Sequence, residues 1–145
     1  MSERTAPGSR ADYRAFREIT TRWMDNDVYG HVNNVVYYSY FDTAVNQYLI
    51  EAGALDIARS PVIGLVVETQ CRYASPIAFP DFVTAGIRVA RIGRSSVRYE
   101  IGLFRNEDDT AAAEGHFVHV YVDRGTNRPT ALPAELVAAL TPIRT

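Results

Sequence analysis

Cysteine is almost absent from this sequence. The one cysteine among the 145 residues, Cys71, has no partner for a disulfide within the chain. It lies on the apolar face of a segment in which apolar and polar residues alternate, which favours a core position over a nucleophile. The pair His116 and His119 resembles a metal motif, but a three-residue step in a strand directs the two side chains to opposite faces. Because zinc sites need clustered ligands, we expect no metal ion.

An excess of charge of one sign is lacking too. Lys and Arg total 15 and Asp and Glu total 17, which leaves a net charge of −2. The basic residues are scattered, so nothing marks a nucleic-acid surface. No apolar run approaches the ~20 residues of a membrane-spanning helix, and the polar start MSERTAPGSR lacks the apolar core of a secretory leader. We therefore predict a cytoplasmic protein that binds neither nucleic acid nor membranes.

Linkers, internal repeats and two common catalytic motifs are also missing. The sequence has no glycine-rich loop with a lysine for phosphates and no G-x-S-x-G nucleophile elbow. With 145 residues, 47% of them hydrophobic, the chain is long enough for one domain with a real core. We predict a flexible N-terminus over residues 1–12 and a single domain over residues 13–145.

Residues 35–52 contain neither proline nor glycine, and their apolar residues follow a helical spacing. Asn33 or Asn34 can cap the first turn, because a short side-chain acceptor satisfies its free amides. Gly53 stands where a glycine would end the helix. The pattern predicts one long helix whose apolar stripe is Val35, Tyr38, Phe41, Val45 and Leu49.

A period of two replaces the helical period in the second half of the chain. It predicts strands within residues 64–73, 81–92, 95–104 and 115–123. One face of the first of these strands is predicted to hold Leu65, Val67, Thr69, Cys71 and Tyr73. A further strand fits 13–22 and a short helix fits 132–140. Because helices do not alternate with the later strands, we predict an α+β fold with an antiparallel sheet on one long helix.

The segment DNDVYGHVNN, residues 25–34, gathers polar side chains directly before the predicted helix. A helix N-terminus offers unpaired amide donors and a partial positive charge, which can hold the oxyanion that forms during acyl transfer. Gly30 permits a turn that would return Asp27 to the helix start. The residues alone leave two interpretations open, a carboxylate beside an oxyanion hole or an ordinary turn and cap.

The run DNDVYGHVNNVVYYSYFDTA, residues 25–44, resembles the signature of hotdog-fold acyl-CoA thioesterases of the 4-hydroxybenzoyl-CoA thioesterase type. That signature has an Asp-x-Asp pair, a glycine three residues on, and a helix start with a nearby tyrosine. Residues 66–104 resemble the sheet that follows in the family. The resemblance spans residues 13–123 and implies an antiparallel sheet wrapped around one long central helix. The matching positions are Asp25, Asp27, Gly30 and Tyr37, with Tyr73 and Pro76 ahead of Asp81.

The resemblance implies an acyl-CoA thioesterase that releases a free acid and CoA without a cofactor. Asp27 takes the position of the catalytic carboxylate, and the backbone amide near Asn34 takes the position that polarises the thioester carbonyl. Asp27 would attack the carbonyl as a nucleophile or activate water as a general base. A positive helix end lowers a carboxylate pKa and so favours the nucleophile, whereas burial acts in the opposite direction.

The chain departs from the 4-hydroxybenzoyl subgroup after Gly30, where that subgroup has apolar and aromatic residues. We therefore do not carry over an aromatic substrate. His31 either positions water or Asp27, or only hydrogen-bonds within the loop. Asp25 is expected to stabilise the loop. Asn33 supports the cap and the oxyanion hole, and Tyr37 either packs in the core or lines the acyl pocket.

In this family the sites lie in clefts between subunits, which implies a homodimer or homotetramer with an acyl-CoA substrate as the other partner. Glu68 and Thr69 of the facing sheet are candidates to complete the site, with core packing as the alternative. The predicted hairpin between the strands of residues 81–92 and 95–104 could meet the phosphates of coenzyme A or be an ordinary solvated turn. Its candidate contacts are Arg91, Arg94, Ser95 and Ser96.

Two other functions stay open. A hotdog dimer can hold acyl-CoA or an acyl carrier without turnover, because a fold does not fix a function. A hotdog enoyl-CoA hydratase or dehydratase also uses a carboxylate and a histidine, which Asp27 and His31 would supply. A panel of acyl-CoA substrates with a free-thiol readout separates these functions from a thioesterase.

Overall fold

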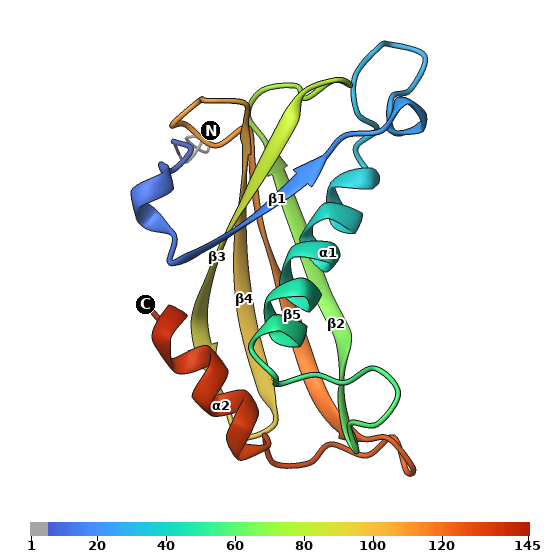
Figure 1. Cartoon of the computed structure of the whole chain (residues 1–145), viewed down its shortest axis with the longest axis vertical. Coiled ribbons are helices and arrows are strands. Elements are labelled where there is room, and N and C mark those ends of the chain that lie inside the picture. The colour runs from blue at the N-terminus through green and yellow to red at the C-terminus, as the bar shows by residue number, and fades with distance from the viewer. Residues whose placement is uncertain (1–5) are drawn as a thin grey trace, which may run out of the picture.

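The computed structural model describes residues 6–145, and Figure 1 shows one antiparallel sheet with a long helix against it. No helix within that range has the length and apolarity to cross a membrane. In chain order the elements are η1 (Arg10–Asp12), β1 (Ala15–Thr20), η2 (Trp23–Asp25), α1 (Val36–Glu51), β2 (Val62–Tyr73), β3 (Phe82–Ile92), β4 (Ser96–Arg105), β5 (Ala113–Asp123), α2 (Ala134–Leu140) and η3 (Thr141–Ile143).

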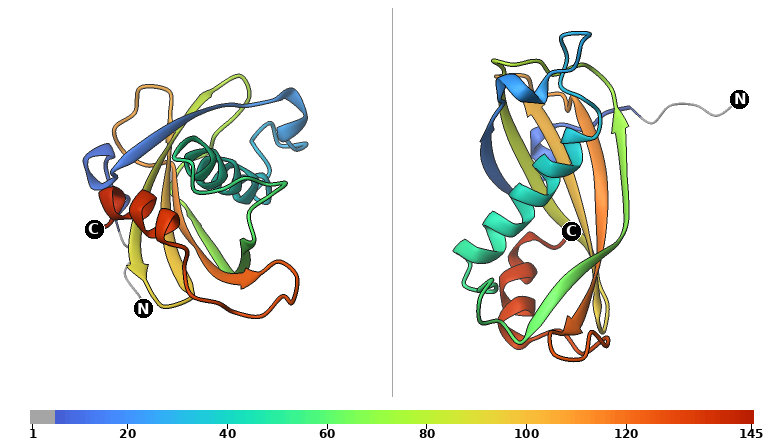
Figure 2. Two further views of the ribbon diagram at one scale, coloured as in Figure 1. Left: turned by 60° about the horizontal axis from the view of Figure 1, so that its bottom comes forward. Right: turned by 90° about the vertical axis from the view of Figure 1, so that its right-hand side faces the viewer.

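The sheet has the strand order β1-β3-β4-β5-β2, and all neighbouring strands are antiparallel. The long α1 crosses one face of the curved sheet (Figure 2). The short α2 lies near the end of the molecule opposite to the start of α1. This arrangement confirms the predicted α+β class. Strands β1 and β2 form the two edges, so β2 keeps one side without a strand partner among residues 6–145.

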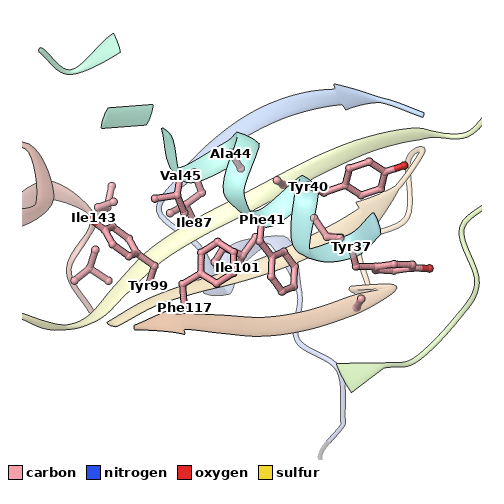
Figure 3. Packing of buried hydrophobic residues seen from close by; sticks show 14 of the residues in the cluster. Tyr37, Tyr40, Phe41, Ala44, Val45, Ile87, Tyr99, Ile101, Phe117 and Ile143 are labelled. Carbon is pink, nitrogen blue, oxygen red and sulfur yellow. The ribbon is translucent and has the colours of Figure 1, made fainter. Parts of the chain in front are cut away.

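The core lies between α1 and the inner face of the sheet (Figure 3). Phe41, Val45 and Leu49 are buried as predicted, but Val35 is 62% exposed and Tyr38 is only partly buried. Tyr37 and Tyr40 are buried instead, because the buried face at the helix start is rotated by one position from the predicted stripe. Each large apolar side chain buried in this way contributes roughly 1.5–3 kcal/mol.

Gly115 of β5 lets α1 approach the sheet closely. A Cβ atom at this position would lie 2.6 Å from the ring of Phe41 and 2.0 Å from the carbonyl oxygen of Gln70. Only glycine leaves room here for both the Phe41 ring and the Gln70 carbonyl. Glycine at this position therefore allows the ring of Phe41 to pack close to the backbone of the sheet. The C-terminal end of α1 is followed by Gly53, whose φ of +74° is the left-handed conformation predicted for a glycine that ends a helix.

A β-bulge divides β2 and corrects its predicted face. The register with β5 shifts between Val66 and Glu68, and a bulge adds one residue to a strand and so changes which side chains point to each face. Leu65 pairs with Val120, on the face away from α1, whereas Thr69 pairs with Phe117 of the inner face. The prediction that Leu65 and Thr69 share a face was therefore wrong.

The segment expected to be a flexible N-terminus makes several contacts in its described part, residues 6–12. The amide of Gly8 donates to the Glu114 carboxylate at 2.8 Å, and the Arg10 guanidinium donates to the backbone oxygens of Asn106 and Asp108. The first part of that prediction, residues 1–5, lies outside the described residues.

Candidate active site

The loop before α1 turns back on itself, as Gly30 predicted. The amide of Asp27 donates to the carbonyl of His31 at 2.9 Å, and the amide of Gly30 donates to the carbonyl of Asp27 at 3.0 Å. Gly30 has a φ of +79°, a conformation that glycine adopts without steric cost. The turn brings Asp27 back toward the start of the helix.

Asp25 fastens this loop to the core. The residue is 1% exposed, and its carboxylate accepts from the Tyr40 hydroxyl at 2.7 Å and from the backbone and guanidinium of Arg22. Burial alone would raise the pKa of Asp25, but the hydrogen bonds from Tyr40 and Arg22 outweigh it and hold the pKa below its usual value. These contacts agree with the expected loop-stabilising role and leave Asp25 no access to a substrate.

Asn33 closes the turn directly before α1. Its side-chain oxygen accepts from the amide of Val35 at 3.1 Å, and its backbone carbonyl accepts from the amide of Val36 at 2.9 Å. The sequence predicted Asn33 or Asn34 as the cap of the helix, but Val35 holds the N-cap position and no side chain caps it, because the oxygen of Asn33 is used in the preceding turn. The exposed Asn34 has a different feature, because its N–H donates to no acceptor within residues 6–145.

An open hollow of about 550 Å³ lies at the start of α1. Four of the predicted site residues line it together, namely Asp27, His31, Asn34 and Tyr37. The half-buried Asp27 is held by the amide of Tyr29, which donates to Oδ1 at 2.8 Å, while Oδ2 accepts from no donor within residues 6–145. Asp27 and Asn34, whose Oδ2 and amide N–H make no hydrogen bond within residues 6–145, therefore line one solvent-accessible hollow.

An aromatic wall closes one side of the hollow. Tyr73 of β2 packs edge-on against Tyr37 with ring centroids 4.8 Å apart, and its hydroxyl donates to the carbonyl of Asn34 at 2.8 Å. Burial raises the pKa of both phenols, so they stay neutral. The core view in Figure 3 places Tyr37 at the end of α1 where the helix begins. Tyr73 thereby connects β2 to the backbone of Asn34, the residue whose amide N–H has no acceptor within residues 6–145.

Sequence reasoning missed part of this lining. Tyr73 and Pro76 were noted in the family resemblance but were not assigned to the site, and Tyr29 and Ser75 were not noted. The signal for Tyr73 was its place at the end of an alternating strand, followed by a proline. No local signal could show that the segment after β2 returns to the start of α1.

The other predicted contacts lie elsewhere in the chain. Glu68 and Thr69 sit in the middle of β2, where the Glu68 carboxylate meets Nε2 of His116 at 2.7 Å and the Thr69 hydroxyl donates to the carbonyl of His116 at 3.1 Å. The β3–β4 hairpin lies beside α2, at the opposite end of the molecule from the loop before α1 (Figure 1). Within one chain the hollow therefore excludes Glu68, Thr69, Arg91, Arg94, Ser95 and Ser96.

Within residues 6–145, no cluster of three or more His, Cys, Asp or Glu side chains is arranged to hold a metal ion. The Cys71 thiol is half-buried, and burial raises its pKa to about 11, so it is protonated at neutral pH and is a poor nucleophile. His116 and His119 lie on opposite faces of the sheet, as the strand spacing predicted, because His116 meets Glu68 and Arg98 while His119 packs against Tyr99 and Phe117.

Solved structures with the same arrangement were found. The PA5185 protein from Pseudomonas aeruginosa strain PAO1 is 54% identical, over 96% of this chain and 97% of its own, with a TM-score of 0.94. The PA2801 protein from the same species, described as a candidate thioesterase, is 31% identical over 89% and 99%, with a TM-score of 0.82. A thioesterase from Thermus thermophilus, solved with coenzyme A and zinc, is 30% identical over 88% and 92%, with a TM-score of 0.73.

Sequence comparison agrees with these structures. A search of curated proteins found no match, but the sequence model of the thioesterase-like superfamily matches residues 21–140. The matched region begins just before the loop that carries Asp27 and runs through α2, so it includes the whole candidate site. Together with the structural neighbours, the match confirms the predicted hotdog fold. The chain belongs to the thioesterase-like superfamily.

Proposed function

We propose that this chain hydrolyses acyl-CoA thioesters to a free acid and coenzyme A, with Asp27 as its catalytic carboxylate. The observation that carries the proposal is that Asp27 and Asn34, whose N–H has no acceptor within residues 6–145, line the same hollow at the start of α1. Family membership supports the reaction class, and the relative from Thermus thermophilus solved with coenzyme A supports a CoA substrate.

The Asn34 amide supplies the oxyanion hole in this proposal. It points from the turn directly before a helix of 16 residues, where the peptide dipoles add a partial positive charge. A thioester oxygen bound there gains negative charge as the tetrahedral intermediate forms, so the amide stabilises the transition state more than the substrate. Tyr73 holds the adjacent carbonyl at 2.8 Å and keeps the turn in place.

Asp27 reacts through Oδ2, because Oδ1 is held by the Tyr29 amide. As a nucleophile, Oδ2 bonds to the thioester carbon, the C–S bond breaks, and CoA leaves as a thiolate; water then hydrolyses the mixed anhydride. As a general base, Oδ2 takes a proton from water, which bonds to the same carbon; the C–S bond then breaks and CoA leaves as a thiol with that proton. A rapid-quench burst of one thiol per subunit, with an acyl mass on Asp27, identifies the first route.

His31 lines the hollow and is exposed. We assign it to hold the attacking water beside Asp27, since its imidazole can accept a hydrogen bond from water and makes none within residues 6–145. Its backbone carbonyl already closes the turn by accepting from Asp27. A His31→Gln variant keeps a hydrogen-bonding side chain and should lower kcat by less than the loss of Asp27 does.

A second copy of the chain would complete the site at the free edge of β2. This strand exposes Leu65, Val66 and Val67 by 42%, 48% and 60%, and an exposed apolar edge strand is a template for pairing. Pairing there would bring another subunit's Glu68 and Thr69 to the interface. The β3–β4 hairpin can meet the phosphates of a CoA bound at Asp27 only from another subunit. We therefore propose a homodimer or a homotetramer as the active form.

The test is a panel of acyl-CoA substrates assayed by free-thiol release. Replacing Asp27 by Asn keeps the size and the Tyr29 contact but removes the charge, and we expect at least a ~10³-fold loss of kcat. The matched control is Asp109→Asn, which removes an exposed carboxylate that does not line the hollow and should leave hydrolysis unchanged. Near-full hydrolysis by Asp27→Asn would refute the catalytic assignment. Tight binding of acyl-CoA with no thiol release by the unaltered protein would indicate a binding module instead.

A further inference from the structure

A second cavity, which we call the distal pocket, lies near the opposite end of α1 from Asp27. It has a volume of about 80 Å³ and is enclosed by α1, the loop after it, the start of β2, the end of β5 and the start of α2. Its walls are mainly apolar, built from side chains such as Leu49, Leu55, Val62, Ile63 and Leu136. No Lys, Arg, Asp or Glu within residues 6–145 lines it.

His119 of β5 adds an imidazole ring to the lining of this apolar pocket. The residue is 4% exposed, and its Nε2 is buried with no hydrogen-bond partner within residues 6–145. Burial lowers the pKa of His119 to about 4, although the Asp42 carboxylate acts in the opposite direction. The imidazole is therefore neutral at pH 7. Buried polar atoms without partners are rare in folded proteins and call for a specific explanation.

The other ring nitrogen of His119 faces the pocket. A Cβ atom built on Gly64, which lines the pocket, would lie 3.0 Å from Nδ1 and 3.0 Å from the ring of Tyr121. Glycine at this position keeps a space open in front of Nδ1. Nε2 has no acceptor nearby, so a proton on Nε2 would be a buried N–H without a partner. The neutral tautomer with the proton on Nδ1 avoids this cost. That tautomer presents an N–H donor to the cavity.

Tyr121 adds a second uncharged group to the same wall. Its hydroxyl shares a hydrogen bond of 2.6 Å with the hydroxyl of Tyr99, and this pair uses only one of its two hydroxyl protons. Burial raises the pKa of Tyr121 to about 12, so the phenol is neutral. Asn46 of α1 also lines the pocket, and its amide nitrogen is already engaged by Asp42.

We infer that the distal pocket binds a small uncharged molecule whose carbonyl or hydroxyl oxygen accepts from His119 and whose short hydrocarbon part contacts the apolar walls. A charged ligand is excluded because it would lose its hydration without gaining an ion pair. A pure hydrocarbon would fit the walls but would leave the imidazole unsatisfied. This inference does not depend on catalysis at Asp27.

The test uses 2-butanone as the probe and butyrate, which has a similar size and a negative charge, as its control. In a titration of the isotope-labelled full chain, amide NMR signals of Gly64 and His119 should shift with butanone and saturate in the millimolar range, as expected for a ligand of so few atoms. Butyrate at pH 7.5 should leave the same signals in place. Saturation of those signals by butyrate with equal affinity would overturn the inference.

Two variants test the geometry. Gly64→Ala places a methyl group in front of Nδ1 and should weaken butanone binding at least fivefold, whereas Gly125→Ala, in an exposed turn, should not. If Gly64→Ala does not fold, His119→Phe keeps a ring of similar shape and should abolish the preference for butanone over butyrate. Thioester hydrolysis should be unaffected in each variant, which separates this site from the Asp27 site. Unchanged butanone affinity in both variants, or a pocket that holds only water and gives no saturable shift, would refute the site.

Discussion

The two ends of α1 border cavities of opposite character. The hollow at the helix start is open, about 550 Å³ in volume, and combines a carboxylate with an unused backbone amide. The distal pocket near the helix end is about 80 Å³, mainly apolar, and holds a neutral histidine. The helix dipole explains part of this difference, because only the N-terminal end offers amide donors to a developing negative charge.

The two cavities also differ in how their polar groups are supported. Near the helix start, Asp25 is buried but receives hydrogen bonds from Tyr40 and Arg22. At the distal pocket, Nε2 of His119 has no such support within residues 6–145. A buried polar group with partners stabilises a fold, whereas one without partners destabilises it. This difference agrees with the two proposals, catalysis at the first cavity and binding of an uncharged ligand at the second.

After Asp27→Asn, the largest expected effect comes from removing the proposed oxyanion donor. Asn34→Pro eliminates the N–H of residue 34, and the fold loses no hydrogen bond because this N–H has no acceptor within residues 6–145. We expect kcat for thioester hydrolysis to fall by about 10²–10³ with little change in unfolding free energy. The matched variant Asn34→Ala keeps the N–H and should retain most activity. Equal activities of the proline and alanine variants in a free-thiol assay would rule out this amide.

The next effect concerns the distal end and its pH dependence. The pKa of His119 is lowered to about 4 by burial, whereas an unfolded histidine titrates near 6.5. Below pH ~6.5 the unfolded chain therefore binds a proton that the folded chain does not accept until about pH 4, so stability falls as the pH drops through this window. By pH 5 the loss should reach about 2 kcal/mol.

Urea unfolding at pH 7.5 and pH 5 measures this loss. His119→Phe should remove about 2 kcal/mol of the decline, whereas His31→Gln, at an exposed histidine, should keep it. If the unaltered protein and His119→Phe lose the same free energy between these pH values, His119 is not buried in its neutral form.

A smaller effect is expected at the support of the active-site loop. Tyr40→Phe removes the hydroxyl that donates to Asp25 at 2.7 Å, which should lower the unfolding free energy by about 1.5 kcal/mol at neutral pH. The pKa of Asp25 is held below its usual value, so its contribution is present above pH ~4 and is lost as the pH falls further. Tyr40→Phe should raise this pKa and move acid unfolding to higher pH. In an Asp25→Asn background the same change should not shift the acid limb.

The smallest effect is expected at the turn before α1. Asn33→Ala removes the acceptor for the Val35 amide and should cost about 1 kcal/mol of unfolding free energy. Thermal unfolding of Asn33→Ala and Asn34→Ala side by side measures this cost, since the side chain of Asn34 accepts no hydrogen bond within residues 6–145. A larger loss in Asn34→Ala than in Asn33→Ala would contradict the role of Asn33 in this turn.

Periodicity predicted the elements well. The helix expected over residues 35–52 spans Val36–Glu51, and each predicted strand overlaps an observed one, because the periods of 3.6 and two are local properties of a chain. The errors occurred where packing overrides the local period. Tyr37 and Tyr40 replaced Val35 and Tyr38 at the buried face, and the bulge in β2 moved Leu65 to the other face.

The site could be predicted only where its residues are close in sequence. Asp27, His31 and Asn34 lie within eight positions of each other, and the structure brings them to one hollow. Tyr73 joins them from a strand 39 residues beyond Asn34, and no local pattern announces such a contact. The sequence could not reveal the state of His119 either. Alternation showed which face of the strand it occupies, but not that its Nε2 has no hydrogen-bond partner within residues 6–145.

Gly115 has a consequence that reaches beyond packing. It has no side chain and touches no substrate, yet it sets the seat of Phe41 and thereby the height of α1 above the sheet. The turn before α1 carries the amide of Asn34, so in the proposed site the reach of the oxyanion donor toward a bound thioester depends partly on an atom group that β5 lacks. A survey of variants chosen only for chemically active residues would pass over this position, although a single methyl group there would displace α1 and, with it, the proposed site.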